Sequence, residues 1–129
     1  MSNVTVKGAS IEQTIKEAFD VTEAVVNQAA ADCSLKAARR VRGLIRTAAI
    51  GGHRYNYGWK VKKEHDGAIV YQSAQPGLTH LLENGHPIVR NGVKVGDSPS
   101  IPHIKPAEEI GVRYFEEIIQ EEIERRLSE

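Results

Sequence analysis

Hydrophobic and small residues recur every three or four positions over residues 11–49, a period that predicts one long amphipathic helix. The residues that share this face are Ile11, Ile15, Ala18, Phe19, Thr22, Val26, Ala29, Cys33, Ala37, Val41, Leu44, Ile45 and Ala48. Ser10 followed by Gln13 forms a capping-box pattern at the start, and Gly51-Gly52 is typical of a helix end. Such a helix spans about 58 Å, more than a small domain is wide. We therefore expect it to bend near residues 32–34, or to project and bury its face on another subunit.

The pattern changes to a period of two after residue 58, which predicts a β-hairpin. Trp59 and Val61 alternate with lysines, and a second apolar run covers residues 68–71. Asp66-Gly67 between the two runs is a strong signal for a tight turn, because such turns need positive φ angles.

Residues 78–83 read as a short helix that Asn84-Gly85 ends, and residues 86–102 are loop-like. Within this loop, residues 93–95 fit a brief strand, so 87–96 is a candidate flexible hairpin arm. A second amphipathic helix follows over 106–127, with Pro106 at its first position. Its apolar face contains Ile110, Tyr114, Phe115, Ile118, Ile119, Ile123 and Leu127.

Together these elements predict a single α+β domain over residues 1–129. A long N-terminal helix (11–49) and a C-terminal helix (106–127) are expected to pack on a small antiparallel sheet. The hairpin, short helix and flexible loop lie between them, over residues 56–104. We expect Trp59, Leu81 and Ile104 to lie in or near the core.

Composition narrows the classes of function. The chain has 17 lysines and arginines and 17 aspartates and glutamates, so its balanced net charge gives no global attraction to nucleic acid or anionic membranes. A single cysteine, Cys33, allows no internal disulfide and suits a reducing compartment. The sequence has no run of about 18 apolar residues, and its first seven residues do not resemble a signal peptide. We therefore expect a protein made in a cytoplasm, without a membrane partner.

The charges are nevertheless segregated along the chain. Residues 36–63 hold nine lysines or arginines and no acid, whereas residues 108–129 hold eight acids and three arginines. The two segments could pair within one monomer or between neighbouring subunits of a ring. Such pairs contribute little stability each, but they can set orientation and register.

The basic segment is also a candidate nucleic-acid surface. Lys36, Arg39, Arg40 and Arg46 crowd one stretch of the first helix, as phosphate contacts require. Tyr55, Tyr57 or Trp59 could then stack on bases. The competing interpretation is a solvated helix face, or a surface that meets the acidic tail.

Catalytic chemistry is weakly indicated. His80, Glu83 and His86 lie three residues apart, with His103 downstream, and a metal-dependent hydrolase is one hypothesis for them. Asn84-Gly85 should end the helix before His86, however, and the spacing is not that of a helical zinc protease. We favour structural histidines and a buried, inert Cys33. For Glu83 we expect either hydrogen bonds from backbone donors of the following loop or an ion pair with a lysine or arginine. No catalytic residue, metal site or cofactor is predicted, and we expect the protein not to be an enzyme.

Three blocks carry a resemblance to a known family. They read Tyr57-Gly58-Trp59-Lys60-Val61, then Leu78-Thr79-His80-Leu81-Leu82-Glu83-Asn84-Gly85-His86, then Pro102-His103-Ile104-Lys105-Pro106-Ala107-Glu108. With them, residues 11–127 resemble the gene-product-ten-like head–tail joining or tail-completion proteins of lambdoid long-tailed phages and prophages. The motif positions are Gly58, Trp59, Leu81, Glu83, Gly85, His86, Pro102, His103 and Pro106. One departure lies at residues 51–56, where relatives carry a Pro-x-Arg-Thr-Gly-like turn.

The resemblance implies a non-enzymatic structural protein of the virion neck or tail top. Such a protein is made in the host bacterial cytoplasm and assembles with copies of itself, as a ring, and with neighbouring tail or head-connector proteins. The candidate contact arm contains Arg90, Asn91, Gly92 and Lys94. The basic face could lie near the DNA path, with non-specific contact. The alternative function is a small nucleic-acid-binding protein that uses residues 36–63.

Overall fold

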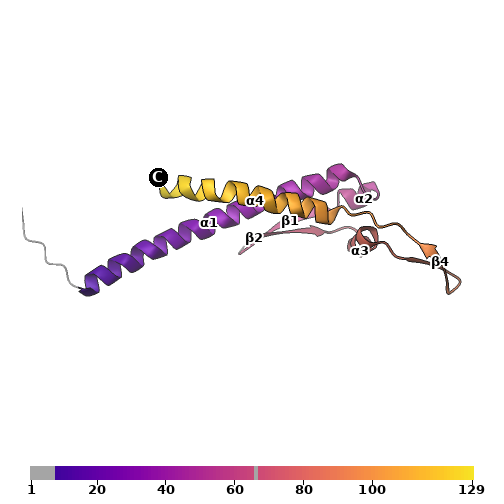
Figure 1. The fold of residues 1–129 in the computed structure, drawn as a ribbon, viewed down its shortest axis with the longest axis horizontal. Helices are drawn as coiled ribbons and strands as arrows, with labels where there is room; N and C mark the ends of the chain where they lie inside the picture. Colours follow the sequence, from indigo (N-terminus) through magenta and orange to yellow (C-terminus); the bar gives the residue numbers. More distant parts are fainter. Residues whose placement is uncertain (1–7, 66) are drawn as a thin grey trace, which may run out of the picture.

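One helix runs along most of the molecule and organises the rest of the chain (Figure 1). The computed structural model describes residues 8–65 and 67–129, with side chains from residue 11 onward. Its elements, in chain order, are α1 (Gly8–Ala48), α2 (His53–Asn56), β1 (Trp59–Glu64), β2 (Gly67–Gln72), α3 (Pro76–Asn84), β3 (Pro87–Arg90), β4 (Val93–Asp97) and α4 (Ile104–Leu127).

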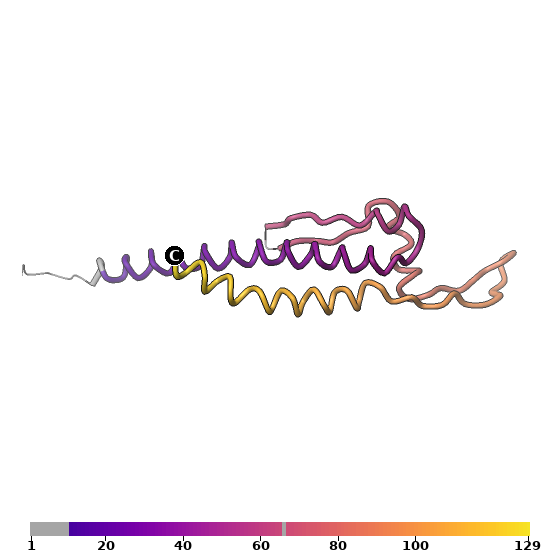
Figure 2. The backbone as a smooth tube through the Cα atoms, turned by 90° about the horizontal axis from the view of Figure 1, so that it is seen from above, coloured from indigo at the N-terminus to yellow at the C-terminus, as the bar shows by residue number. Residues whose placement is uncertain are grey.

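The predicted α+β fold is confirmed, with a different packing of its layers. Figure 2 shows α1 in the middle, the β1–β2 hairpin on one side of it and α4 on the other. The C-terminal helix therefore packs mainly along α1, and not on the sheet as expected. The strands form two separate antiparallel pairs, β1–β2 and β3–β4, because no strand of the first pair bonds to the second.

The hydrophobic core is small and lies where α1, α2, β1 and α4 meet. Ile45, Tyr55, Trp59 and Ala107 are buried there. Five half-buried residues surround them, namely Val41, Leu44, Val70, Leu82 and Ile104. The expectations for Trp59 and Ile104 are thus confirmed.

The expectation for Leu81 is wrong, since its side chain is 40% exposed. Neighbouring positions on a helix point about 100° apart, so α3 can turn only one of its adjacent leucines inward. That leucine is Leu82, which packs against the core.

Helices α1 and α4 approach closely because small residues line their contact. Ala29, Cys33 and Ala37 of α1 are buried, and so is Gly111 of α4. A Cβ atom at Gly111 would overlap the side chain of Val41. Burial of Cys33 is as expected, and it raises the pKa of the thiol above its ordinary value.

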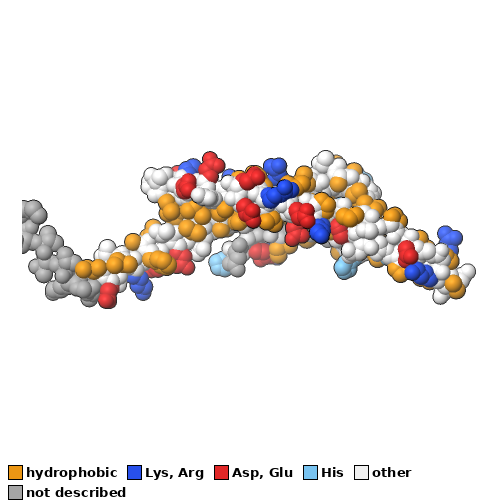
Figure 3. All heavy atoms as spheres, viewed as in Figure 1, with side chains coloured by type: hydrophobic (Ala, Val, Ile, Leu, Met, Phe, Trp, Pro, Cys, Tyr) orange, Lys and Arg blue, Asp and Glu red, His pale blue; other side chains and the backbone are white. Residues whose placement is uncertain are grey.

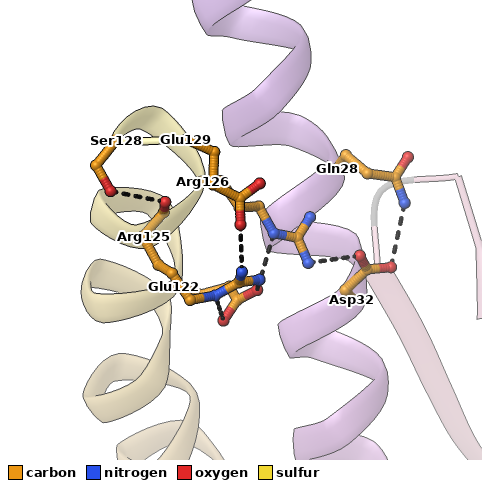
Figure 4. A network of polar contacts seen from close by, with 7 residues as sticks. All are labelled: Gln28, Asp32, Glu122, Arg125, Arg126, Ser128 and Glu129. Atoms are coloured by element: carbon orange, nitrogen blue, oxygen red, sulfur yellow. Dashed lines mark hydrogen bonds and ion pairs between the residues drawn. The ribbon is translucent and has the colours of Figure 1, made fainter.

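A polar network closes this helix–helix seam near the end of α4 (Figure 4). The Arg126 guanidinium donates to Asp32 Oδ2 at 2.9 Å, and also to Glu122 Oε1 at 2.9 Å. Gln28 donates to Asp32 Oδ1 at 3.1 Å, and Lys63 lies 3.9 Å from the same oxygen. The hydrogen bond from Arg126 holds the pKa of Asp32 below its ordinary value. The network therefore fixes the register of α4 on α1.

This pairing is opposite in sign to the one expected between the basic and acidic segments. The acid lies on α1 and the base on α4. Across the described ranges, no ion pair joins residues 36–63 to residues 108–129. Most charges of both segments therefore stay at the surface.

The first helix differs from its sequence-based prediction in three ways. It is already helical at Gly8, so Ser10 lies within its first turn and not before it, and Gln13 donates to Glu17. It runs unbroken through residues 32–34, so the break that was one of the two expected alternatives is absent, and the projecting helix remains. Its predicted buried face is buried only from Ala29 to Ile45, whereas residues 11–24 are exposed because α4 does not extend over them (Figure 1).

The boundaries of later elements also differ. Helix α4 begins at Ile104, so Pro106 occupies its third position and not its first. Within the expected loop over 86–102, the candidate hairpin arm is present as β3–β4, with a register shift between Ile88 and Val89 and a turn that places Asn91 and Gly92 at φ 53° and 77°. The β1–β2 hairpin is confirmed, with Trp59 opposite Gln72, although Asp66 of the predicted turn lies outside the described residues.

Two helical glycines provide a matched test of the α1–α4 contact. Gly43 has open space around it, so Gly43→Ala should stabilise the protein by about 1 kcal/mol through helix propensity alone. Gly111→Ala gains the same propensity but overpacks the seam, at a cost of about 1–3 kcal/mol. We therefore expect denaturant unfolding to show a loss of stability for Gly111→Ala. Equal stabilisation by both substitutions would contradict the close contact.

Candidate functional site

The three sequence blocks of the resemblance meet at one buried polar junction. His103, 4% exposed, lies 5.7 Å from Tyr55 and 6.3 Å from Trp59 between ring centroids. Glu83 of α3 approaches from the other side, with Oε1 3.5 Å from His103 Nδ1. Residues far apart in sequence thus hold α2, β1, α3 and the start of α4 together.

The His103 ring is fixed at both nitrogens. Nδ1 lies 2.9 Å from the Ile101 carbonyl oxygen, and Nε2 lies 2.7 Å from the Tyr55 hydroxyl. Because a carbonyl oxygen can only accept, we assign a proton to Nδ1, and in that tautomer Nε2 accepts from the Tyr55 hydroxyl. Burial raises the pKa of the Tyr55 hydroxyl, so that it stays a donor. This geometry suits a structural histidine.

Glu83 caps the N-terminus of α4. Its two carboxylate oxygens accept from the backbone N–H of His103 at 2.8 and 3.1 Å, and from that of Ile104 at 2.9 and 3.1 Å. The first N–H groups of a helix have no partner within the helix, and a negative charge there is favoured by the helix dipole. The expectation that Glu83 binds backbone donors is confirmed, and its role is that of a cap supplied by another helix.

The pKa of Glu83 reflects this contact. Burial by itself raises the pKa, but the N–H groups of Ile104 and His103 outweigh it and bring it below the ordinary value of 4.5. The carboxylate is therefore kept charged at neutral pH, as a cap requires. A general acid would need the opposite shift.

Two glycines of the motifs are required by close backbone packing. A Cβ at Gly58 would overlap the Gln72 side chain, which donates to the Tyr55 carbonyl at 2.7 Å. Gly85 has φ 74°, and a Cβ there would meet the Ser98 carbonyl. These positions shape the junction and the base of the β3–β4 hairpin.

The remaining motif residues lie at the edge of the junction. The His86 backbone N–H donates to Ser98 Oγ at 2.9 Å, and its ring Nδ1 lies 3.0 Å from the Pro87 carbonyl. Pro102 and Pro106 are exposed on either side of His103. They restrict the chain as it enters α4.

The histidines of the metal hypothesis are not brought together. His80 is exposed, with Nδ1 3.4 Å from the Asn84 amide nitrogen, and His86 and His103 have the separate contacts given above. Among the residues that the structure describes, no group of three or more histidine, cysteine, aspartate and glutamate side chains is arranged to hold a metal ion.

The candidate basic face is only partly available. Lys36, Arg39 and Arg40 are exposed, and the Arg40 guanidinium also lies over the Tyr114 ring, 4.6 Å from its centroid. Arg46 is half-buried and donates to the Trp59 carbonyl at 2.7 Å.

The aromatic residues suggested for base stacking are mostly out of reach. Tyr55 and Trp59 are buried at 0% and 3% exposure, so that part of the prediction is wrong. Tyr57 is exposed, and its ring lies beside His53 and Arg46.

Two exposed apolar elements lie at opposite ends of the long axis (Figures 1 and 3). One is residues 11–24 of α1, which we call the projecting segment. The other is β3–β4, the distal hairpin, in which Val89, Val93 and Val95 are each more than half exposed. The predicted contact residues Arg90, Asn91, Gly92 and Lys94 form its tip, where Lys94 pairs with Asp97 at 3.2 Å.

Sequence reasoning missed Tyr55 and Gln72 as members of the junction. Tyr55 lies on α2, a single helical turn in the segment where the sequence departs from the pattern of the resemblance, and so short an element has no periodicity to detect. The available signal was local, because Gly51-Gly52 before an aromatic residue marks a tight reversal that can turn that residue inward.

Comparison with known proteins adds no assignment: no family model, no curated protein and no solved structure matches this chain. In the part of the chain that the structure describes, no helix combines the length and apolar character needed to cross a membrane.

The Glu83 cap makes stability depend on pH. Glu83→Gln should lower the free energy of unfolding by about 1–2 kcal/mol at pH 7. Because the folded-state pKa of Glu83 is lowered, its contribution is full above its ordinary value of 4.5 and is lost as pH falls through the folded pKa. The free energies of unfolding of the wild type and of Glu83→Gln should therefore approach each other as pH falls from 7 to 3. Glu116→Gln, at an exposed position in mid-helix, is the control and should have little effect.

The Tyr55–His103 hydrogen bond can be tested with two matched tyrosines. Tyr55→Phe leaves the buried Nε2 of His103 without its donor and should cost about 1–3 kcal/mol in thermal or denaturant unfolding. Tyr57→Phe removes the same hydroxyl from an exposed ring and should change stability little. Similar effects for both substitutions would mean that the buried bond is unimportant.

Proposed function

We propose that this chain is a structural protein of phage virion assembly, which completes the tail or joins head to tail at the neck through protein–protein contacts. The observation that carries the proposal is that separate parts of the chain form the buried junction and the exposed apolar surfaces. The motif residues of the resemblance are used to build one junction, while two exposed apolar elements extend from it in opposite directions (Figure 3).

The distal hairpin has the properties of a contact surface. An isolated two-stranded hairpin is only marginally stable in water, and unpaired strand edges readily add another strand. Exposed valines on β3 and β4 would lose contact with water when a partner packs on them. The base of the hairpin is held closed by His86 and Ser98, so its tip is displayed from a fixed support.

The buried junction supports a structural role over a catalytic one. Tyr55, Glu83 and His103 direct their polar atoms to one another and to the backbone. The proposed partners are other copies of this chain in a ring and neighbouring tail or head-connector proteins. The proposed location is the host cytoplasm before assembly and the virion neck afterwards.

A nucleic-acid-binding function is the weaker alternative. Two of the four arginines and lysines proposed for it are engaged within the chain, and two of the three aromatic residues are buried. Exposed Lys36 and Arg39 leave room for non-specific contact with DNA, which we keep as a secondary property of the assembled particle.

Deletion of residues 90–96 tests the proposal. The Ser98 N–H still donates to the His86 carbonyl, so the junction and α4 should keep their stability in circular dichroism melting. Particles made with the shortened protein should fail to join heads to tails, as seen by electron microscopy and plaque counts.

Asn91→Asp is the matched control for this deletion. Asp tolerates the positive φ that residue 91 adopts, so the turn and the whole hairpin should be retained and infectivity should be normal. Normal infectious particles from the deletion variant would refute a contact role for the distal hairpin.

A further inference from the structure

The projecting segment carries an apolar stripe that the described chain leaves uncovered. Ile11, Ile15 and Phe19 follow one another at four-residue steps and are 46%, 63% and 67% exposed. The same helical face is buried farther along α1, at Ala29 and Cys33, where α4 covers it. Figure 2 shows that α1 extends beyond the end of α4, so this stripe continues the face that α4 covers farther along.

The segment is also acidic. It contains Glu12, Glu17, Asp20 and Glu23 but only one base, Lys16. Within the described residues none of these four carboxylates takes part in an ion pair. An occupant of this surface should thus combine exposed apolar side chains with positive charge.

The outer face of the β1–β2 hairpin has this combination. Trp59, Val61 and Val70 turn toward α1, so strand alternation places the residues between them on the opposite face. There Lys60 is paired with Tyr71 and Lys62 with Ile69 across the two strands. Tyr71 is 40% exposed and Ile69 is 48% exposed, and Lys62 forms an ion pair with Glu64 of its own strand.

We propose that the projecting segment of one copy packs on the outer face of the β1–β2 hairpin of the next copy. This inference rests on the proposed assembly function, and it names the surface through which copies of the chain meet. Ile15 and Phe19 would pack on Ile69 and Tyr71, and flanking carboxylates would lie beside Lys60 and Lys62.

The dimensions of the two surfaces agree. Fourteen helical residues span about 21 Å, and six strand residues span about 20 Å. Two paired strands present a width of about 10 Å with their side chains, close to the diameter of one helix. The helix can therefore lie along the hairpin over its full length.

Charge selects this pairing over symmetric ones. Two projecting segments placed together would bring carboxylates against carboxylates, and two hairpin faces would bring lysines against lysines. Only the pairing of unlike surfaces joins opposite charges. Such a contact is heterologous, and repetition of it closes a ring or extends a filament.

Two variants, each damaged on one surface, test the contact. Ile15→Asp/Phe19→Asp changes the projecting segment, and Ile69→Glu/Tyr71→Glu changes the hairpin face. We expect wild-type protein to associate with rising concentration in light scattering, and each variant alone to stay monomeric, with affinity weakened at least about a hundredfold. Equal mixing should give a one-to-one dimer, because the mixture contains one intact copy of each surface.

Val21→Asp is the control for the projecting segment. Val21 is 64% exposed but lies on the other side of the helix from Phe19, so association should remain at the wild-type level. Circular dichroism checks the fold of every variant. If the hairpin variant unfolds, Lys60→Glu/Lys62→Glu replaces it, since both lysines are exposed.

Each other outcome overturns the inference. Dimers formed by the hairpin variant alone would mean that projecting segments pair with each other. A mixture that stays monomeric, or a wild type that stays monomeric at every concentration, would mean that these surfaces do not meet. Neither result bears on the distal hairpin, because its deletion is tested by head–tail joining. Failure of this contact and failure of the proposed function can therefore be told apart.

Discussion

The contact of Glu83 with the first N–H groups of α4 is the constraint on which the rest of the fold depends. This carboxylate lies on α3, yet it completes the hydrogen bonds of a helix that begins some twenty residues later. It thereby fixes where the chain turns back along α1. The adjacent Tyr55–His103 bond ties the same point to α2, and Trp59 packs against it from β1. Three elements of the chain, α2, α3 and β1, thus meet the start of α4 at this one point.

The rest of the molecule is stabilised more by the long contact between α1 and α4 than by a large buried core. Few side chains are fully buried, and the largest of them are Tyr55 and Ile45. Stability beyond the junction comes from the long α1–α4 seam, where alanine and glycine allow close approach. The ion pair of Arg126 with Asp32 then fixes the sliding position of one helix on the other. A molecule built in this way has much surface for its size, which suits a protein that functions within an assembly.

The sequence was sufficient for elements with strong local periodicity. The long helix, the C-terminal helix and the β1–β2 hairpin could be predicted because each repeats its pattern over several turns or several alternations. Backbone donors were one of two partners expected for Glu83, because a carboxylate next to leucines and followed by a loop needs either such donors or a basic side chain. The predicted start of the helix that Glu83 caps lies two residues after the observed start at Ile104, because Pro106 by itself suits the first position of a helix.

Features that depend on tertiary contacts were beyond local patterns. Periodicity reports that a helical face is apolar, but not what covers it, so residues 11–24 were expected to be as buried as residues 29–45. For the same reason Leu81 and Leu82 were indistinguishable until the direction of α3 was known. Tyr55 was missed because its burial requires His103, which lies 48 positions away.

The unbroken course of α1 has a consequence for how its sequence can change. A helix transmits angle as well as distance, since each residue adds about 1.5 Å and about 100° of rotation. One residue inserted between the seam and residue 24 would therefore turn the apolar stripe away from its original direction while barely lengthening the molecule. Seven inserted residues would nearly restore the direction at a greater reach. Variation in the length of this helix should thus be tolerated in steps of whole turns, because only these keep the apolar stripe facing its original direction.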